Sequence, residues 1–239
     1  PNRQAEGPFA FEYNGNYYLT YPYVRENTEV LGYAMSKNPM GPYEYKGIIM
    51  AEHENGCWTN HHSIVKYKGQ WYLFYHHNAF SPDFDKNRSA QIERLYFNED
   101  GTIREVKPTM RGVGPVKASH KIHIDRYSSM EGARIEYLDT SDYFKGWKTV
   151  FANAGDYVAF NAVDFGKEAP KNLTIRVKAA ADASLEVVAG KTVVKTDVAK
   201  TEDWAEVSFP MPAKVKGMQD ITVRLKTDAD VEVDWITFK

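Results

Sequence analysis

A glutamate near the start of the chain has the chemistry of a proton donor. Glu6 lies in the segment Glu6-Gly7-Pro8, immediately before a predicted strand, and a carboxyl group can act as a general acid or base. A glutamate beside Gly-Pro can equally be a solvated turn residue, so the residue type alone assigns no role. Which of these two roles Glu6 has depends on the polar residues that the fold brings near it.

Histidines are concentrated in one stretch, as the adjacent pairs His61-His62 and His76-His77. Two or three histidines on one face would suit zinc, but adjacent residues of a strand point to opposite faces. At most one of each pair can then face a common site, and neither a cysteine pattern nor a His-Glu-x-x-His spacing accompanies them. We therefore expect one histidine to contact a substrate, or water on a hard cation.

Arg88 follows a polar loop that carries Asp83 and Asp85. Its guanidinium either neutralises one of these aspartates or enters the site of Glu6, where its N–H groups would hydrogen-bond a polar ligand. The sequence leaves both interpretations open.

An internal repeat indicates the elements that would position these side chains. Residues 11–21 (FEYNGNYYLTY) match residues 65–75 (VKYKGQWYLFY) at an offset of 54 residues. Each copy is two β-rich runs joined by a tight-turn pair, Asn14-Gly15 or Lys68-Gly69. A hairpin unit repeated at about 50 residues is typical of propeller blades. Two blades do not close a propeller, so we expect this half to be incomplete.

The same offset makes Glu6 equivalent to Asn60, the neighbour of His61. The first strands of propeller blades line the central channel, where ligands usually bind. The repeat therefore predicts that Glu6, Asn60 and His61 lie near one axis.

The second half of the chain has the pattern of a β-sandwich. Apolar and polar residues alternate over residues 173–178, 221–226 and 231–235, between turns rich in glycine, aspartate and proline. Strands with one apolar face favour an antiparallel sandwich. Residues 111–121 are rich in glycine, lysine and small residues and indicate a boundary. We predict an all-β chain with domains over residues 1–115 and 116–239.

The composition and motifs argue against a nucleic-acid-binding protein, a membrane-spanning protein, a small disulfide-stapled scaffold, a phosphoryl-transfer enzyme and a serine hydrolase. The 239 residues have a net charge of −2, one cysteine (Cys57) and no apolar run long enough to span a membrane. No phosphate loop, nucleophile elbow or basic aromatic strip is present. The aromatic fraction of 14% fits β-sheet cores, and exposed aromatic rings would also form platforms for sugars. The chain begins at Pro1 without a signal peptide, so we expect the natural protein to begin upstream.

The first half resembles glycoside hydrolase family 43, on the segments Glu6-Gly7-Pro8-Phe9, Thr59-Asn60-His61-His62-Ser63, Trp71-Tyr72-Leu73-Phe74-Tyr75-His76 and Arg88-Ser89. The resemblance covers residues 1 to about 115 and implies the last blades of a five-bladed β-propeller. It implies an inverting glycosidase of xylosides and α-L-arabinofuranosides, with Glu6 as general acid, His61 at the channel floor and Arg88 facing substrate. The family's other two carboxylates, a base aspartate among them, would then lie upstream of Pro1. This chain alone is therefore expected to be inactive.

The second half resembles a family 6 carbohydrate-binding module, a jelly-roll sandwich, on Ile122-His123-Ile124-Asp125-Arg126-Tyr127, Asn153-Ala154-Gly155-Asp156-Tyr157, Trp204 and Val233-Asp234-Trp235. The resemblance implies that Phe151 and Trp204 sandwich a sugar ring, and that Asp125 and Asp234 hold a structural calcium ion. Three positions depart from the family: His123 replaces the usual Glu, Phe151 replaces the usual Tyr, and Glu232 replaces a frequent sugar-binding Asn.

The two resemblances together predict an α-L-arabinofuranosidase that debranches arabinoxylan, with β-xylosidase as the alternative. A non-catalytic polysaccharide-binding protein is the alternative from another class. The expected partners are a plant cell-wall polysaccharide or oligosaccharide and the N-terminal fragment of the same precursor. By resemblance, we expect a periplasmic or extracellular bacterial protein.

Overall fold

The computed structural model describes residues 6–53, 57–78, 80 and 88–239. The chain divides into two compact units, residues 1–113 and 114–239. The described residues are almost entirely strands, turns and irregular segments; one 3₁₀ turn, Tyr143–Lys145 (η1), is the helical element found among them. The prediction of an all-β chain is confirmed. Nowhere in these described ranges is there a helix with the length and apolar character needed to cross a membrane.

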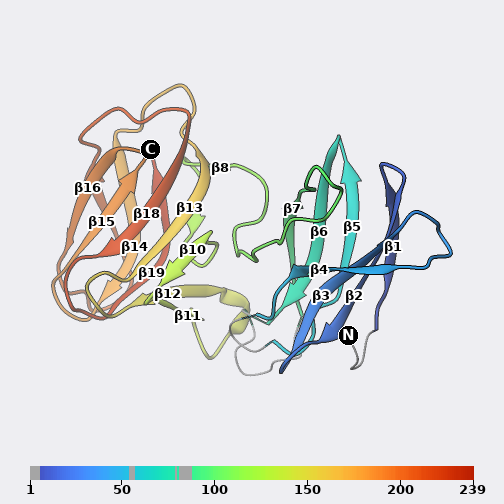
Figure 1. The fold of residues 1–239 in the computed structure, drawn as a ribbon. Coiled ribbons are helices and arrows are strands. Elements are labelled where there is room, and N and C mark those ends of the chain that lie inside the picture. Colours follow the sequence, from blue (N-terminus) through green and yellow to red (C-terminus); the bar gives the residue numbers. More distant parts are fainter. Residues whose placement is uncertain (1–5, 54–56, 79, 81–87) are drawn as a thin grey trace. The chain divides into compact units, whose positions relative to one another are not determined.

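The first unit contains two antiparallel sheets in which neighbouring strands follow chain order (Figure 1). The four-stranded sheet consists of β1 (Phe9–Tyr13), β2 (Asn16–Val24), β3 (Glu29–Ser36) and β4 (Glu44–Met50). The three-stranded sheet consists of β5 (His62–Tyr67), β6 (Gln70–His77) and β7 (Ser89–Leu95). Such meanders are the form of propeller blades.

The hairpins of the predicted repeat are β1–β2 and β5–β6, with Phe11 opposite Tyr18 and Val65 opposite Tyr72. Both turns use two residues of positive φ, 51° and 68° at Asn14-Gly15 and 47° and 85° at Lys68-Gly69. Two-residue turns of this hand match the twist of antiparallel strands. Local turn chemistry therefore fixes both hairpins, and the repeat is confirmed.

One apolar cluster joins the two sheets of the first unit. Buried residues of β2 and β3, such as Tyr18 and Leu31, pack in the same cluster as Leu73 of β6 and Leu95 of β7. Phe11 of β1 stacks on Tyr18, with ring centroids 4.6 Å apart. Each fully buried side chain of this size contributes roughly 1.5–3 kcal/mol, so the cluster holds the two blades in one body.

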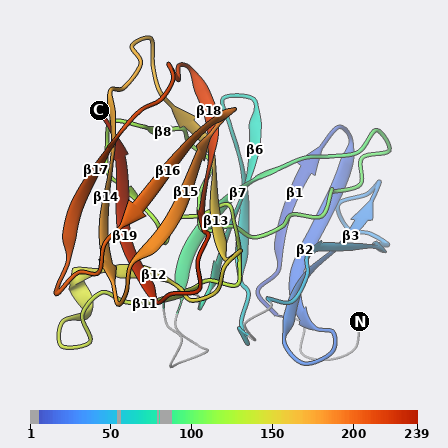
Figure 2. The ribbon, with the colours of Figure 1, turned by 90° about the vertical axis from the view of Figure 1, so that its left-hand side faces the viewer.

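The second unit is a sandwich of two six-stranded sheets (Figure 2). One sheet has the order β10 (Ser129–Glu131), β13 (Tyr157–Asp164), β18 (Met218–Leu225), β15 (Ala183–Ala189) and β16 (Thr192–Val198), with β8 (Val116–Lys117) beside β13. The other has the order β11 (Arg134–Tyr137), β12 (Trp147–Phe151), β19 (Val231–Phe238), β14 (Asn172–Ala179) and β17 (Ala205–Pro210), with β9 (Ile122–His123) beside β19.

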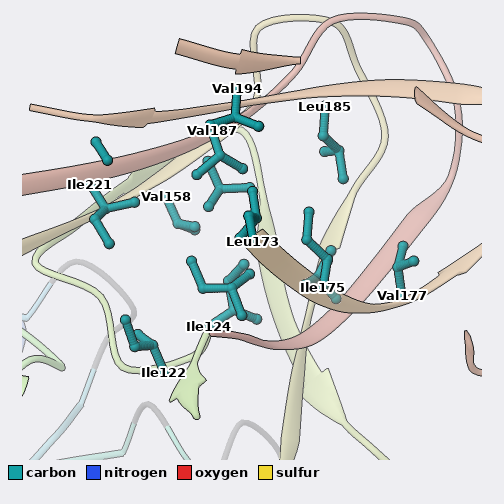
Figure 3. Packing of buried hydrophobic residues seen from close by; sticks show 14 of the residues in the cluster. Ile122, Ile124, Val158, Leu173, Ile175, Val177, Leu185, Val187, Val194 and Ile221 are labelled. Atoms are coloured by element: carbon teal, nitrogen blue, oxygen red, sulfur yellow. The ribbon is translucent and has the colours of Figure 1, made fainter. Parts of the chain in front are cut away.

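The core of the second unit lies between these sheets. Alternate residues of β14 (Leu173, Ile175 and Val177) are buried in the same cluster as Leu185 and Val187 of β15, and Figure 3 shows these side chains directed into one shared interior. The alternation predicted from the sequence therefore marks the inward faces correctly.

Candidate active site

Glu6 and His61 lie together, each just before the first strand of its hairpin. Glu6 precedes β1, and its backbone N–H donates to the carbonyl oxygen of Pro22 at 3.3 Å. Its carboxylate oxygen Oε2 is 3.5 Å from Nε2 of His61, and its side chain is 57% exposed. The offset of the repeat thus predicted a real juxtaposition of these two residues. Their roles toward a substrate stay predictions.

Gly7 makes this close approach possible. A Cβ atom at this position would lie 2.8 Å from both Cε1 and Nδ1 of His61, and the residue has a φ of +48°. An L-residue with a side chain would therefore meet the imidazole and also adopt a strained backbone conformation. The absence of a side chain at Gly7 therefore leaves the space that the imidazole of His61 occupies.

A third residue, Glu29, lies beside Glu6 and His61 and was not singled out from the sequence. It is the first residue of β3 and is 2% exposed. Its Oε2 accepts a hydrogen bond of 2.9 Å from the backbone N–H of Asn60. Ligand atoms of Glu6, Glu29 and His61 all lie within 4.8 Å of one another. This is the one group of three or more possible metal ligands within the described residues, and its chemistry also suits proton transfer.

The surroundings of Glu29 favour the neutral form of its carboxyl group. Burial raises the pKa of Glu29, and the charge and side-chain hydrogen bond of Glu6 raise it further. The Asn60 N–H and the charge of His61 oppose this rise. Two carboxyl groups this close favour a state in which one of them keeps its proton.

His62 and His76, the neighbours of His61 in sequence and space, are held by hydrogen bonds of their own. His76 Nε2 accepts a hydrogen bond of 3.1 Å from the backbone N–H of His61, so this nitrogen carries no proton. His62 Nε2 is 2.6 Å from the hydroxyl of Thr20. That hydroxyl already donates to the carbonyl oxygen of Phe9, so His62 is the donor. Burial lowers the pKa of both His62 and His76 to about 4, which keeps them neutral at physiological pH.

Arg88 is exposed and immediately precedes β7. After burial, its charge is the next cause of the lowered pKa of His76, so the guanidinium lies within electrostatic reach of the residue that holds His61. The predicted alternative partners, Asp83 and Asp85, lie outside the described residues.

In the second unit, the prediction for Phe151 is wrong. The ring is 0% exposed and belongs to the sandwich core, so it cannot stack on a sugar. Phe151 pairs with Val231 on the inward side of β19. Trp204 is partly exposed, and the guanidinium carbon of Arg176 lies 4.8 Å from its ring centroid.

The carboxylates predicted to bind calcium are already matched by cationic groups of the chain. Arg126 Nε is 3.3 Å from Asp125 Oδ2, Arg176 forms a hydrogen-bonded ion pair with Asp234, and His123 Nδ1 is 3.6 Å from the same carboxylate. Burial alone would raise the pKa of Asp234, but hydrogen bonds from His123 and Arg176 bring it below its ordinary value. This donor set does not fit a calcium ion.

Comparison with protein families accounts for both units. Residues 2–103 match the family model of glycosyl hydrolases family 43, and residues 125–239 match that of carbohydrate binding module family 6. The chain joins a family 43 segment to a family 6 module. The propeller-blade and sandwich folds predicted for these segments are thereby confirmed.

Two curated relatives are named for xylan-degrading activities. A beta-xylosidase of Xylanibacter ruminicola is 43% identical over 107 residues, which cover 45% of this chain and 32% of the relative. An arabinoxylan arabinofuranohydrolase of Paenibacillus polymyxa is 27% identical over 206 residues, which cover 76% of this chain and 32% of the relative. The chain thus spans about a third of the length of these relatives.

A solved structure shares the fold over both units. It is a family 43 arabinoxylan arabinofuranohydrolase from Bacillus subtilis in complex with cellotetraose, with a TM-score of 0.58 and 22% sequence identity. The match covers 98% of this chain and 54% of the solved chain.

Proposed function

We propose that the complete protein containing this chain is an inverting α-L-arabinofuranosidase that removes side chains from arabinoxylan. The observation that carries the proposal is the pairing of Glu6 with His61, 3.5 Å apart, at equivalent places before two propeller hairpins. A carboxyl group held there can protonate the oxygen of the leaving group. Inversion further needs a base carboxylate about 6.5–9.5 Å away, with a water molecule between the two.

The base aspartate belongs, in this proposal, to a part of the protein upstream of Pro1. Residues 1–239 alone are then inactive, because a general acid without its base lacks the group that activates water. The N-terminal part of the same precursor would pair with this chain and complete the channel. The substrate is a polymer too large to enter a cell, so we propose a periplasmic or extracellular site of action.

The choice of arabinofuranose is supported by relatives that align along both units. Two of them, from Paenibacillus polymyxa and Bacillus subtilis, are named arabinoxylan arabinofuranohydrolases, and their alignments cover 76% and 84% of this chain. β-Xylosidase is the second candidate, because the relative with 43% identity in the family 43 segment is a beta-xylosidase. The family 6 module would bind the same polysaccharide, with Trp204 as its predicted aromatic contact.

Product analysis tests the proposal. The complete protein is incubated with arabinoxylan, and the released sugar and its first-formed anomer are identified by proton NMR. Release of arabinose with inverted configuration is expected from the complete protein, and none from residues 1–239. Release of xylose alone would establish the β-xylosidase alternative. Xylan binding without release of any sugar would establish the non-catalytic, polysaccharide-binding alternative.

A further inference from the structure

We propose that Glu29 is a positioning residue that holds the general acid Glu6 and His61 in the geometry needed for proton donation. The inference rests on the proposed function and assigns a residue that neither the motifs nor the family match singles out. Its basis is the trio of ligand atoms within 4.8 Å, in which Glu29 is the buried member.

Glu29 is itself rigidly placed between the two hairpins. Its backbone N–H donates to the carbonyl oxygen of Trp58 at 3.1 Å, and its side chain accepts from the N–H of Asn60 at 2.9 Å. These two bonds tie the start of β3 to the segment that leads into β5. Because His61 follows Asn60 directly, Glu29 fixes the place of the imidazole as well as its own.

Glu6 depends on such a support. Its side chain is 57% exposed, and it precedes β1 in a segment that contributes one backbone hydrogen bond, to Pro22, among the described residues. A proton donor must lie within hydrogen-bond reach of the leaving oxygen, and a displacement of about 1 Å can cost about 100-fold in rate. A buried carboxyl group beside Glu6 restricts the orientations that the exposed carboxyl group can adopt.

The protonation behaviour of Glu29 agrees with this role. Its pKa is raised, first by burial and also by Glu6, so the neutral form can donate a hydrogen bond to the neighbouring carboxyl group. The Asn60 N–H donates to the same carboxyl group, at Oε2. Glu29 therefore contacts the segments that precede both hairpins.

The dependence of kcat/KM on the leaving group distinguishes a misplaced proton donor from a general structural defect. The complete protein is assayed on two aryl glycosides of the sugar it cleaves, one with a 2,4-dinitrophenolate leaving group and one with unsubstituted phenolate. The first departs without protonation and the second needs an acid. Glu29→Asp keeps the carboxyl group but withdraws it from Glu6 by one methylene, and it is expected to lower kcat/KM about 10- to 100-fold for the phenyl glycoside. The dinitrophenyl glycoside should lose less than about 3-fold, since it bypasses the acid.

Glu52→Gln is the matched control. The Glu52 carboxylate also accepts backbone N–H groups, those of Glu26, Asn27 and Thr28 at 3.1–3.2 Å, on the loop before Glu29. This variant should change both substrates by the same factor. Glu29→Gln keeps a carbonyl oxygen that can accept from Asn60 and an N–H group that can donate to Glu6, so it should retain most of the activity on the phenyl glycoside that Glu29→Asp loses.

The outcomes separate this inference from the proposed function. If Glu6→Gln loses activity on the phenyl glycoside alone and Glu29→Asp loses both activities equally, Glu29 is only structural and the inference is overturned. If Glu6→Gln itself shows no such difference between the substrates, Glu6 is not the acid and the proposed function fails with it.

Discussion

Replacement of Gly7 by alanine tests the packing on which the candidate site depends. A Cβ atom at Gly7 would lie 2.8 Å from two ring atoms of His61, at a φ of +48°. The left-handed backbone alone costs about 1–2 kcal/mol for a residue with a side chain. The overlap then forces the imidazole away from Glu6, since ordinary van der Waals contact needs several tenths of an ångström more. We expect Gly7→Ala to lose about 10- to 100-fold in kcat/KM.

Gly15→Ala provides the control that separates strain from overlap. Gly15 has a φ of +68° in the β1–β2 turn, and a Cβ atom added there would meet no other atom within 4 Å. It should therefore lose a similar amount, about 1–2 kcal/mol, of the free energy of unfolding with kcat/KM unchanged. Urea unfolding followed by tryptophan fluorescence, together with steady-state kinetics of the complete protein, measures both quantities. Equal activities in the two alanine variants would show that His61 is not held against Gly7, and the site would have to be rebuilt.

Three further predictions concern stability. The melting temperature should be the same in calcium chloride and in excess chelator, because Asp234 is already paired with Arg176, and a rise with calcium would show that the donor set does bind the ion. Phe151→Ala should cost about 3–5 kcal/mol in a urea titration, whereas a loss near zero would place the ring outside the core. Since burial lowers the folded pKa of His62 to about 4, the unfolded chain binds more protons between pH 6.5 and 4. The free energy of unfolding of the first unit should therefore fall as pH falls through this window. His62→Gln should make this fall smaller, and urea titrations at several pH values measure it.

The hairpins of the first unit could be predicted because their determinants are local. Asn14-Gly15 and Lys68-Gly69 adopt the positive φ values that two-residue turns require, and the apolar pattern fixes each register. The 54-residue offset between the two hairpins then placed Glu6 and the segment that contains His61 at equivalent positions of the repeat.

Glu29 could not be predicted in the same way. Its proposed role rests on contact with Asn60, 31 residues away, and a glutamate at the start of an apolar strand has no distinctive local pattern. The available signal was weak: Glu29 begins a strand whose next six residues are all buried. An acidic residue at the start of so buried a strand needs a specific partner.

The error at Phe151 has a different cause. A motif match places a residue in the chain but does not determine which face of the sheet it occupies. Phe151 opposes Val231, and Thr149 opposes Val233, so all four residues share the inward parity. Likewise, the pairing of Asp234 with Arg176 depends on a register shift between Arg176 and Val177, which sequence alternation does not reveal.

The central claim is that Glu6 donates the proton to the departing sugar oxygen, and one comparison tests it most directly. Arabinose release from arabinoxylan and binding to the same polysaccharide are measured for the complete protein and for its Glu6→Gln variant. The account predicts that the variant binds as the parent does and releases arabinose at least about 100 times more slowly. Undiminished release by Glu6→Gln would contradict it.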